Sequence, residues 1–326
     1  MQREAVLVVG GAGYIGSHTA KRLSKEYEVL VYDNLSRGHQ WAVQWGDLIK
    51  GDFGDKEKLK EVLLQRKIVG VFHFAASSQV GESMKDPLLY WRNNVAKTAY
   101  LLTAMKEVGV KYFVFSSSAA VYGEPENIPI EEDLQPAPSN PYGKTKLSVE
   151  AMLRDCQMSH GLSFSALRYF NAAGASPDAE IGEDHTPETH LIPLILDVAM
   201  GRRREIKIFG QDYPTRDGTC VRDYIHVSDL ANAHVLAFNK LKQGRDELTL
   251  NLGNGRGYSV KEVVDMVRRV TNIDIEAVPA PRRAGDPATL VASSKKATKE
   301  LDWHPDYASL EDIVGTAWQF HQKHFG

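Results

Sequence analysis

Tyr142 and Lys146 are the residues whose types and spacing most directly predict chemistry in this chain. They lie in Pro141-Tyr142-Gly143-Lys144-Thr145-Lys146, at the start of an expected helix over 141–159, and residues four apart share one helix face. An unperturbed tyrosine titrates near ~10, and a nearby ammonium favours the phenolate. We therefore expect Lys146 to lower the pKa of Tyr142 and make it a general base near neutral pH.

Three consecutive serines, Ser116, Ser117 and Ser118, close the strand expected before this helix, over 111–116. The carboxyl edge of an open parallel sheet is where such folds bind their ligands. A serine hydroxyl beside Tyr142 can carry its proton or hold a substrate oxygen. The residues alone do not decide which of the three serines does this.

A glycine-rich turn follows the first expected strand, residues 5–9, and opens a helix. It reads Gly10-Gly11-Ala12-Gly13-Tyr14-Ile15-Gly16, and such glycines let backbone N–H groups approach a pyrophosphate at the helix N-terminus. The second strand ends in Asp33-Asn34, and an acid there accepts hydrogen bonds from both ribose hydroxyls and repels a 2′-phosphate. Together these segments predict an NAD site rather than an NADP site.

Two later segments fit the same site. Gly51-Asp52-Phe53 follows the third strand and is placed to hold the adenine edge. His73-Phe74-Ala75-Ala76 ends the fourth strand, with small residues where a dinucleotide passes closely. His73 is flanked by apolar residues, so we assign it a structural role.

The elements that carry these residues alternate in the first half of the chain. Strands are expected at 5–9, 28–32, 69–74, 111–116 and 163–169, and helices at 14–25, 55–65, 87–108 and 141–159. This alternation predicts an α/β fold with a Rossmann-type, doubly wound parallel sheet. After about residue 171 glycine and proline become frequent, which predicts a smaller C-terminal α/β substrate-binding lobe. We expect an NAD-binding domain over 1–171 and a mainly substrate-binding lobe over 172–326, with the chain crossing back around 223–255.

Later elements are marked by their own local signals. Loops are expected at 181–189 and 210–219, which are rich in Gly, Pro, Asp and Thr. Ser259 and Glu262 form a capping-box pattern before a helix that starts at Val260, and Ser309 with Asp312 marks the last helix.

Composition narrows the function classes. A net charge of −3 gives no electrostatic footprint for nucleic acid or an acidic membrane. The two cysteines, Cys156 and Cys220, form neither a disulfide framework nor a metal-ligand spacing, so no metal site is expected. The apolar run before the first glycines is too short for a signal segment or a membrane span, which predicts a cytoplasmic location.

These motifs resemble the extended short-chain dehydrogenase/reductases and, among them, the UDP-glucose 4-epimerase family. The resemblance spans essentially the whole chain, and its second-half motifs are the more specific ones. The motifs are GGAGYIGSH at 10–18, DNLSRGH at 33–39, FSSSAAVYG at 115–123, PYGKTK at 141–146, RYFNAAGA at 168–175, IGEDHTPETHLIP at 181–193, DGTCVRDYIHVSDL at 217–230, NLGNG at 251–255 and PRRAGDPA at 281–288.

The resemblance implies a catalytic set of Ser118, Tyr142 and Lys146. Tyr142 is expected to take the proton of the sugar 4-hydroxyl while hydride passes to NAD⁺. Lys146 is expected to bind the nicotinamide ribose, and Ser118 to bridge to the 4-oxygen. The 4-keto sugar then turns over and receives the hydride on its opposite face.

The resemblance also implies the binding residues. NAD contacts are expected at Gly10, Gly13, Tyr14, Ile15, Gly16, Asp33, Asn34, Asp52, Phe53, Phe74, Ala75, Ala76, Asn94, Ser116, Tyr142, Lys146 and Tyr169. UDP-sugar contacts are expected at Ser118, Tyr142, Phe170, Asn171, His190, Leu191, Lys207, Phe209, Arg222, Tyr224, Arg283 and Asp286. Arginines suit a diphosphate, whereas Asp286 suits ribose hydroxyls.

Three positions vary within the family. Ser78 stands where some relatives carry lysine, and His190 where some carry asparagine. Leu290 stands where a bulky aromatic closes the sugar pocket in some relatives, so we expect this chain to admit N-acetylated sugars as well.

Other enzymes of the superfamily are the main alternatives. A 4,6-dehydratase carries an Asp-Glu pair after the active-site hydroxyl residue, whereas Ala119-Ala120 follows Ser118 here. A UDP-uronate 4-epimerase or decarboxylase remains open. A non-catalytic dinucleotide-binding regulator is the remote alternative, since such a protein is expected to have lost Tyr142 or Lys146.

A homodimer is also implied by resemblance, through a four-helix bundle of the helices near 87–108 and 141–159. The apolar residues available there are Leu88, Leu89, Trp91, Val95 and Leu102. Burial within one subunit explains them equally well.

Overall fold

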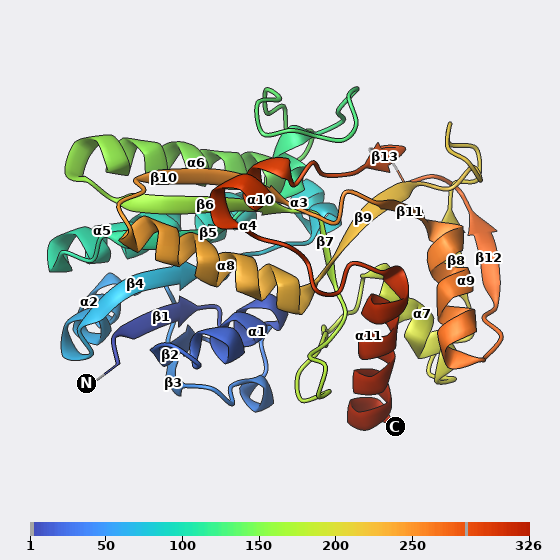
Figure 1. Ribbon diagram of the computed structural model, residues 1–326, viewed down its shortest axis with the longest axis horizontal. Coiled ribbons are helices and arrows are strands. Elements are labelled where there is room, and N and C mark those ends of the chain that lie inside the picture. The colour runs from blue at the N-terminus through green and yellow to red at the C-terminus, as the bar shows by residue number, and fades with distance from the viewer. Residues whose placement is uncertain (1–2, 284–285) are drawn as a thin grey trace.

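The computed structural model describes residues 3–283 and 286–326 and consists of two lobes (Figure 1). Two residues of the PRRAGDPA motif, Ala284 and Gly285, lie outside the described residues. Within the described ranges, no helix combines the length and apolar character that crossing a membrane requires.

The larger lobe is built on a seven-stranded sheet in the order β10-β6-β5-β4-β1-β2-β3, in which every pairing is parallel. This confirms the predicted doubly wound fold. Its strands are β1 (Ala5–Val9), β2 (Glu28–Asp33), β3 (Asp47–Lys50), β4 (Ile68–His73), β5 (Tyr112–Ser116), β6 (Ser163–Tyr169) and β10 (Glu247–Leu252).

Helices cover both faces of this sheet, because its strands alternate apolar side chains to either side. In β1, Leu7 packs with residues of α2, α5 and α6 on one face, and Val8 with residues of α1, α8 and α10 on the other. The helices are α1 (Tyr14–Leu23), α2 (Lys56–Gln65), α5 (Lys97–Val108), α6 (Pro141–His160), α8 (Val227–Lys242) and α10 (Lys295–Leu301).

Most expected elements of the first half are observed within one or two residues. The expected helix over 87–108 is instead divided into α4 (Pro87–Tyr90), the π-helical segment η2 (Trp91–Ala96) and α5, after a short α3 (Val80–Lys85). The remaining short helical turns of this lobe are η1 (Gln40–Ala42) and η3 (Ala119–Tyr122).

The smaller lobe packs three helices around its own apolar core, formed by residues such as Ile195, Val264 and Ile313. The capping box at Ser259 and Glu262 is present, and Ser309 caps the last helix, both as predicted. The elements are β7 (Asn171–Ala173), α7 (Leu191–Ala199), β8 (Ile206–Phe209), β9 (Val221–His226), β11 (Gly257–Ser259), α9 (Val260–Thr271), β12 (Ala277–Ala280), β13 (Thr289–Leu290) and α11 (Leu310–Phe325).

The chain passes between the lobes more than once. β9 belongs to the small sheet β11-β9-β13 with β7, yet it leads directly into α8 and β10 of the larger lobe. In Figure 1, α8 lies across the large sheet while α7, α9 and α11 gather at the opposite end of the molecule.

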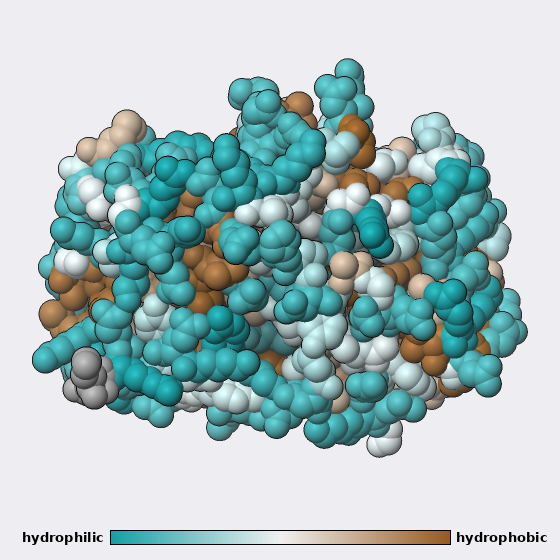
Figure 2. All heavy atoms as spheres, in the orientation of Figure 1, coloured by the Kyte–Doolittle hydropathy of each residue, from teal (hydrophilic) through white to brown (hydrophobic). Residues whose placement is uncertain are grey.

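Exposed apolar side chains occur on the helices that the family resemblance assigns to a dimer. Leu88 is 74% exposed, Trp91 38% and Met158, near the end of α6, 73%. Leu102, on α5, is instead buried in the core of the subunit, which is the alternative that the sequence left open for these residues. The face shown in Figure 2 is mostly hydrophilic, with apolar residues in separate patches.

Candidate active site

Tyr142 and Lys146 lie on the first turns of α6, at the carboxyl edge of the large sheet. The helix begins there because Asn140 caps it, accepting a hydrogen bond from Gly143 N at 2.9 Å, and Pro141 occupies its first turn. Lys146 Nζ donates to the Ser116 carbonyl at 2.7 Å and lies 5.8 Å from the centre of the Tyr142 ring. The spacing of the pair along the helix therefore brings both side chains to the serine-rich strand end.

The electrostatics of this pair differ from the sequence-based expectation. Burial raises the pKa of Tyr142, and a hydrogen bond with Ser118 opposes that shift. Burial lowers the pKa of Lys146 to about 7, with Glu150 acting in the opposite direction. The expectation that Lys146 lowers the pKa of Tyr142 is wrong for the protein alone, because burial raises the pKa of the tyrosine and also disfavours the lysine as a cation.

The three serines have three different partners. The Ser116 hydroxyl bonds with the hydroxyl of Tyr169, and the buried Ser117 hydroxyl donates to Glu150 at 2.6 Å. Ser118 accepts from Ala120 N at 3.1 Å and is the serine whose side chain lowers the pKa of Tyr142. Of the three, Ser118 is thus the one placed to act together with Tyr142.

Two glycines of the turn, Gly10 and Gly16, are packed too closely for any larger residue. Gly10 has φ +81° and a Cβ there would lie 2.4 Å from Ala75 N, while one on Gly16 would lie 2.2 Å from Gly10 O. Gly13 precedes α1, and Phe74 N and Ala75 N both donate to Val9 O. The backbone amides of this turn and of the 74–76 segment therefore meet at one edge of the sheet.

The acids at the ends of β2 and β3 are held in place. Asp33 accepts from Ala12 N at 3.0 Å and from Leu35 N at 2.8 Å, which fixes its carboxylate beside the glycine turn. Asn34 donates to Asp52 at 3.2 Å. Burial alone would raise the pKa of Asp52, but the hydrogen bond from Lys97 at 2.7 Å leaves it lowered and ionised.

Several residues expected to contact NAD use their side chains elsewhere. The Tyr14 hydroxyl donates to Gly174 O at 2.6 Å and so joins the two lobes, Ile15 packs under the large sheet, and Phe53 is buried against the His73 ring. The Asn94 amide bonds Ser77 N at 2.8 Å and Thr145 Oγ1 at 3.1 Å. These side chains are engaged within the protein, and their contacts with a cofactor stay a prediction.

The donor set suits a dinucleotide. Lys146 is 3% exposed, and among the described residues its ammonium donates one hydrogen bond, to Ser116 O, although it carries three donors. A buried ammonium with spare donors fits the hydroxyls of a nicotinamide ribose. Asp33 beside the glycine turn likewise fits the hydroxyls of an adenosine ribose.

The expected substrate residues gather in the smaller lobe and at its border. Asn171 donates to Asp223 O at 3.0 Å. Arg222 forms an ion pair with Asp286, so these two expected substrate contacts bind each other in this structure. The Arg283 guanidinium lies 4.0 Å from the centre of the Phe209 ring. Leu191 begins α7, and Lys207 is exposed on β8. Phe170 and Leu290 pack against the apolar cluster that contains Val121. Tyr224 is buried in the core of the smaller lobe.

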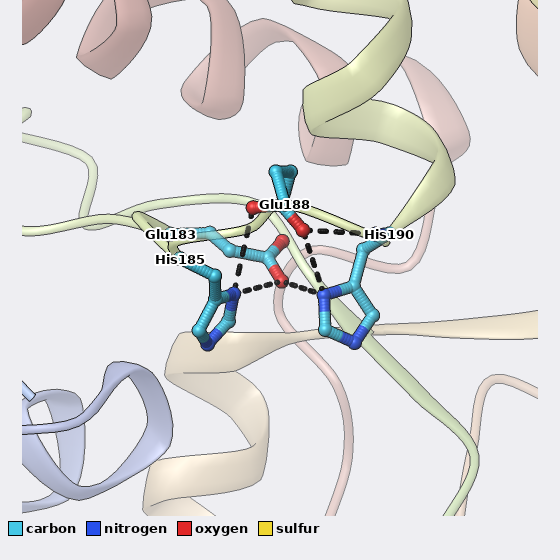
Figure 3. A group of neighbouring side chains, drawn as sticks. All are labelled: Glu183, His185, Glu188 and His190. Atoms are coloured by element: carbon cyan, nitrogen blue, oxygen red, sulfur yellow. Dashed lines mark hydrogen bonds and ion pairs between the residues drawn. The ribbon is translucent and has the colours of Figure 1, made fainter. Parts of the chain in front are cut away.

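Two groups were not anticipated from the sequence. A buried pair of Glu150 and Arg168 joins α6 to β6, and its only sequence signal is two charged residues at otherwise apolar-facing positions. The second group is Glu183, His185, Glu188 and His190, which converge in the loop before α7 (Figure 3). The spacing Glu-x-His-x-x-Glu-x-His is a sequence signal for this group. It was missed because only the spacing of the cysteines was considered.

Comparison with known proteins agrees with this geometry. Residues 6–253 match the NAD dependent epimerase/dehydratase family. A UDP-glucose 4-epimerase of Halalkalibacterium halodurans is 53% identical over 321 residues, 98% of this chain and 96% of that protein.

Solved structures share the whole fold. The UDP-glucose 4-epimerase from Brucella ovis in complex with NAD is 50% identical with a TM-score of 0.95, covering 97% of this chain and 98% of that one. The enzyme from Bifidobacterium longum in complex with NAD⁺ and UDP is 37% identical with a TM-score of 0.93, covering 98% of each chain. The chain therefore belongs to the NAD dependent epimerase/dehydratase family, and within it to the UDP-glucose 4-epimerases.

Proposed function

We propose that this chain interconverts UDP-glucose and UDP-galactose by NAD-dependent epimerisation at C4, through a 4-keto sugar. The observation that carries the proposal is the meeting of Ser118, Tyr142 and Lys146 at the carboxyl edge of the large sheet. Full-length similarity to UDP-glucose 4-epimerases supports the same reaction.

Tyr142 is the acid/base in this proposal. Its phenolate removes the proton of the sugar 4-hydroxyl, and the hydroxyl so formed later returns it, while Ser118 holds the 4-oxygen beside it. A bound NAD⁺ would supply the hydride acceptor for C4 and, once reduced, the hydride donor to the opposite face of the keto sugar. Lys146 orients the nicotinamide ribose and, in its protonated form, stabilises the tyrosine phenolate.

Ala119 and Ala120 limit what else the site does. They form η3 directly after Ser118, and their methyl groups can neither donate nor accept a proton. Elimination of water from the sugar needs an acid and a base at these positions, so we propose epimerisation rather than dehydration.

The two ligands are proposed to share the two lobes. Residues 1–171, joined by the returning segment around 223–255, hold NAD through the glycine turn, Asp33 and Lys146. The rest of 172–326 holds the UDP-sugar, with Arg222 and Arg283 on the diphosphate. Asp286 then exchanges its pairing with Arg222 for the uridine ribose.

We further propose a cytoplasmic homodimer formed through α4–η2–α5 and α6. The exposed Leu88, Trp91 and Met158 on these helices support that interface. Light scattering after size exclusion tests it: wild type is expected at twice the chain mass, and Leu88→Glu with Met158→Glu is expected at the monomer mass. A monomeric wild type contradicts the proposal.

The reaction itself is tested with purified protein and UDP-galactose, without added NAD, followed by chromatography. An equilibrium mixture with UDP-glucose is the expected result, and it also shows that NAD stays bound. Failure to convert UDP-galactose even with NAD supplied contradicts the proposed substrate pair.

A further inference from the structure

The loop between β7 and α7 brings four metal-ligating side chains to one point. Glu183, His185, Glu188 and His190 each offer one ligand atom, and these atoms all lie within 4.8 Å of one another (Figure 3). The group, called here the Glu/His cluster, joins the loop to the first residue before α7, because His190 precedes Leu191 at the start of that helix.

The distances within the Glu/His cluster match the edges of a small coordination sphere. Glu183 Oε1 lies 2.8 Å from His190 Nδ1 and 3.4 Å from His185 Nδ1. Glu188 Oε1 lies 3.0 Å from His190 Nδ1, and the other oxygen, Oε2, lies 3.4 Å from His185 Nδ1. Four ligands at about 2.0–2.1 Å in a tetrahedron stand roughly 3.3 Å apart, and these four carboxylate–imidazole distances lie near that value.

Protons alone account poorly for this arrangement. A protonated Nδ1 has one N–H and donates it in one direction, to one carboxylate. Here, however, the Nδ1 atoms of both histidines face the same two carboxylates. His185 Nδ1 is buried and makes no hydrogen bond of acceptable geometry, although both carboxylates are within 3.4 Å. A single ion between the four groups contacts all of them at once.

The charges of the four side chains also favour a bound cation. Glu183 is 5% exposed, and within residues 3–283 and 286–326 its ion-pair partners are the two histidines. Two carboxylates and two neutral imidazoles carry −2, which a divalent cation neutralises. Keeping both histidines protonated instead places two cationic rings with centres 5.1 Å apart.

The ligand types select the kind of ion. Ca²⁺ and Mg²⁺ take six or more oxygen ligands, whereas two imidazole nitrogens and two carboxylate oxygens suit Zn²⁺ and similar transition ions. Four protein ligands fill a tetrahedral ion completely, as in structural rather than catalytic zinc sites. We propose that the Glu/His cluster is a structural Zn²⁺ site that fastens the 183–190 loop to α7.

Zn²⁺ binding to the untagged, NAD-bound, full-length protein tests this. After treatment with chelator and addition of ZnCl₂, gel filtration and elemental analysis are expected to show one Zn²⁺ per chain, and Zn²⁺ is expected to raise the melting temperature by several degrees. His185→Asn and Glu188→Gln are expected to weaken Zn²⁺ affinity at least tenfold. His304→Asn, which changes an exposed histidine outside the cluster, is the matched control and is expected to bind as wild type does.

Folding and geometry are checked separately. Melting in chelator is expected to be alike for wild type and both variants, which separates lost binding from lost structure. Co²⁺ in place of Zn²⁺ is expected to give the intense visible absorption of a four-coordinate ion. Absence of stoichiometric Zn²⁺, retention unchanged in both variants, or a weak six-coordinate Co²⁺ spectrum each overturns the proposal.

Discussion

Arg168 and Glu150 face each other as a two-pronged pair: Nε donates to one carboxylate oxygen at 2.9 Å and Nη2 to the other at 2.6 Å. Glu150 is one turn after Lys146 on α6, and both charged residues are almost fully buried. Arg168 also donates to Tyr122, the last residue of η3. The pair therefore fixes the catalytic helix α6 against β6, the strand that pairs with β5 and its terminal Ser116.

Breaking this pair is predicted to cost much of the stability of the protein. Glu150→Ala leaves a buried guanidinium without its carboxylate, so we expect the free energy of unfolding to fall by about 3–5 kcal/mol. Glu247→Ala removes the exposed partner of Arg154 and is expected to cost at most about 1 kcal/mol. Urea denaturation measures the free energy of unfolding of both variants. Equal decreases in the two variants would show that the buried pair stabilises the protein no more than the exposed pair does.

Tyr142→Phe is predicted to lower kcat by about 10²–10⁴-fold, because it removes the group that exchanges the proton. NAD content is expected to stay at the wild-type level, since the ring and Lys146 remain. Tyr100→Phe, on the exposed surface of α5, is the matched control. A Tyr142→Phe enzyme with wild-type kcat would remove Tyr142 from the proposed role.

Arg222→Leu is predicted to raise KM for UDP-galactose about tenfold to a hundredfold, because hydrogen bonds between charged groups are worth about 1.5–3 kcal/mol. Arg216→Leu removes an arginine that pairs with Glu262 on the surface, and its KM is expected to be unchanged. Initial rates over a range of UDP-galactose concentrations decide it. If the two variants give the same KM, Arg222 does not bind the diphosphate.

Leu290→Tyr is predicted to abolish conversion of UDP-N-acetylglucosamine while preserving that of UDP-glucose, because the larger ring fills the space left for an N-acetyl group. Leu290 lies on β13, against the cluster of Val121, Tyr122 and Ile130. Rates with both sugars, for wild type and variant, measure the effect. If the wild-type enzyme does not convert the N-acetylated sugar, the expectation that this chain admits N-acetylated sugars is wrong.

Acid is predicted to destabilise the fold through His226. Burial lowers the pKa of His226 to about 3, followed by a smaller effect of His18, whereas an unfolded histidine titrates near ~6.5. Below about 6.5 the unfolded state therefore binds a proton at this position that the folded state does not, and His226 by itself lowers stability by about 1.4 kcal/mol per pH unit until the pH approaches 3.

His226→Asn isolates this effect. The imidazole accepts from Ser228 N as the N-cap of α8, and asparagine can cap in its place without titrating. Denaturation between pH 7 and pH 5 is expected to show a shallower loss of stability in His226→Asn than in wild type or His304→Asn. Parallel pH profiles for all three would contradict the assignment.

The first half of the chain was the more predictable from sequence, for physical reasons. Buried parallel strands such as Ala5–Val9 and Tyr112–Ser116 are continuous apolar runs, and Ser259 with Glu262 marks a helix start locally. The edge strand Asp47–Lys50 is short and polar, so the sequence placed a third strand before Gly51 without giving its bounds. The π-helical turn at Trp91–Ala96 was likewise invisible to a pattern of helical period.

The chemistry of the site was predictable in its residue types but not in its electrostatics. The spacing of Tyr142 and Lys146 placed both side chains correctly on α6. The direction of the tyrosine pKa depends on burial by distant segments, which spacing does not contain. The pairing of Arg222 with Asp286 joins β9 to a loop more than sixty residues later, and only the fold brings them together.

The most direct measurement of the central claim follows the hydrogen at C4. Purified enzyme is incubated in ordinary water with UDP-galactose that carries deuterium at C4, and the UDP-glucose formed is analysed by NMR. Epimerisation by oxidation and reduction at one site predicts that the deuterium is retained at C4 of the product. Replacement of that deuterium by solvent hydrogen, or the absence of UDP-glucose altogether, would contradict the account.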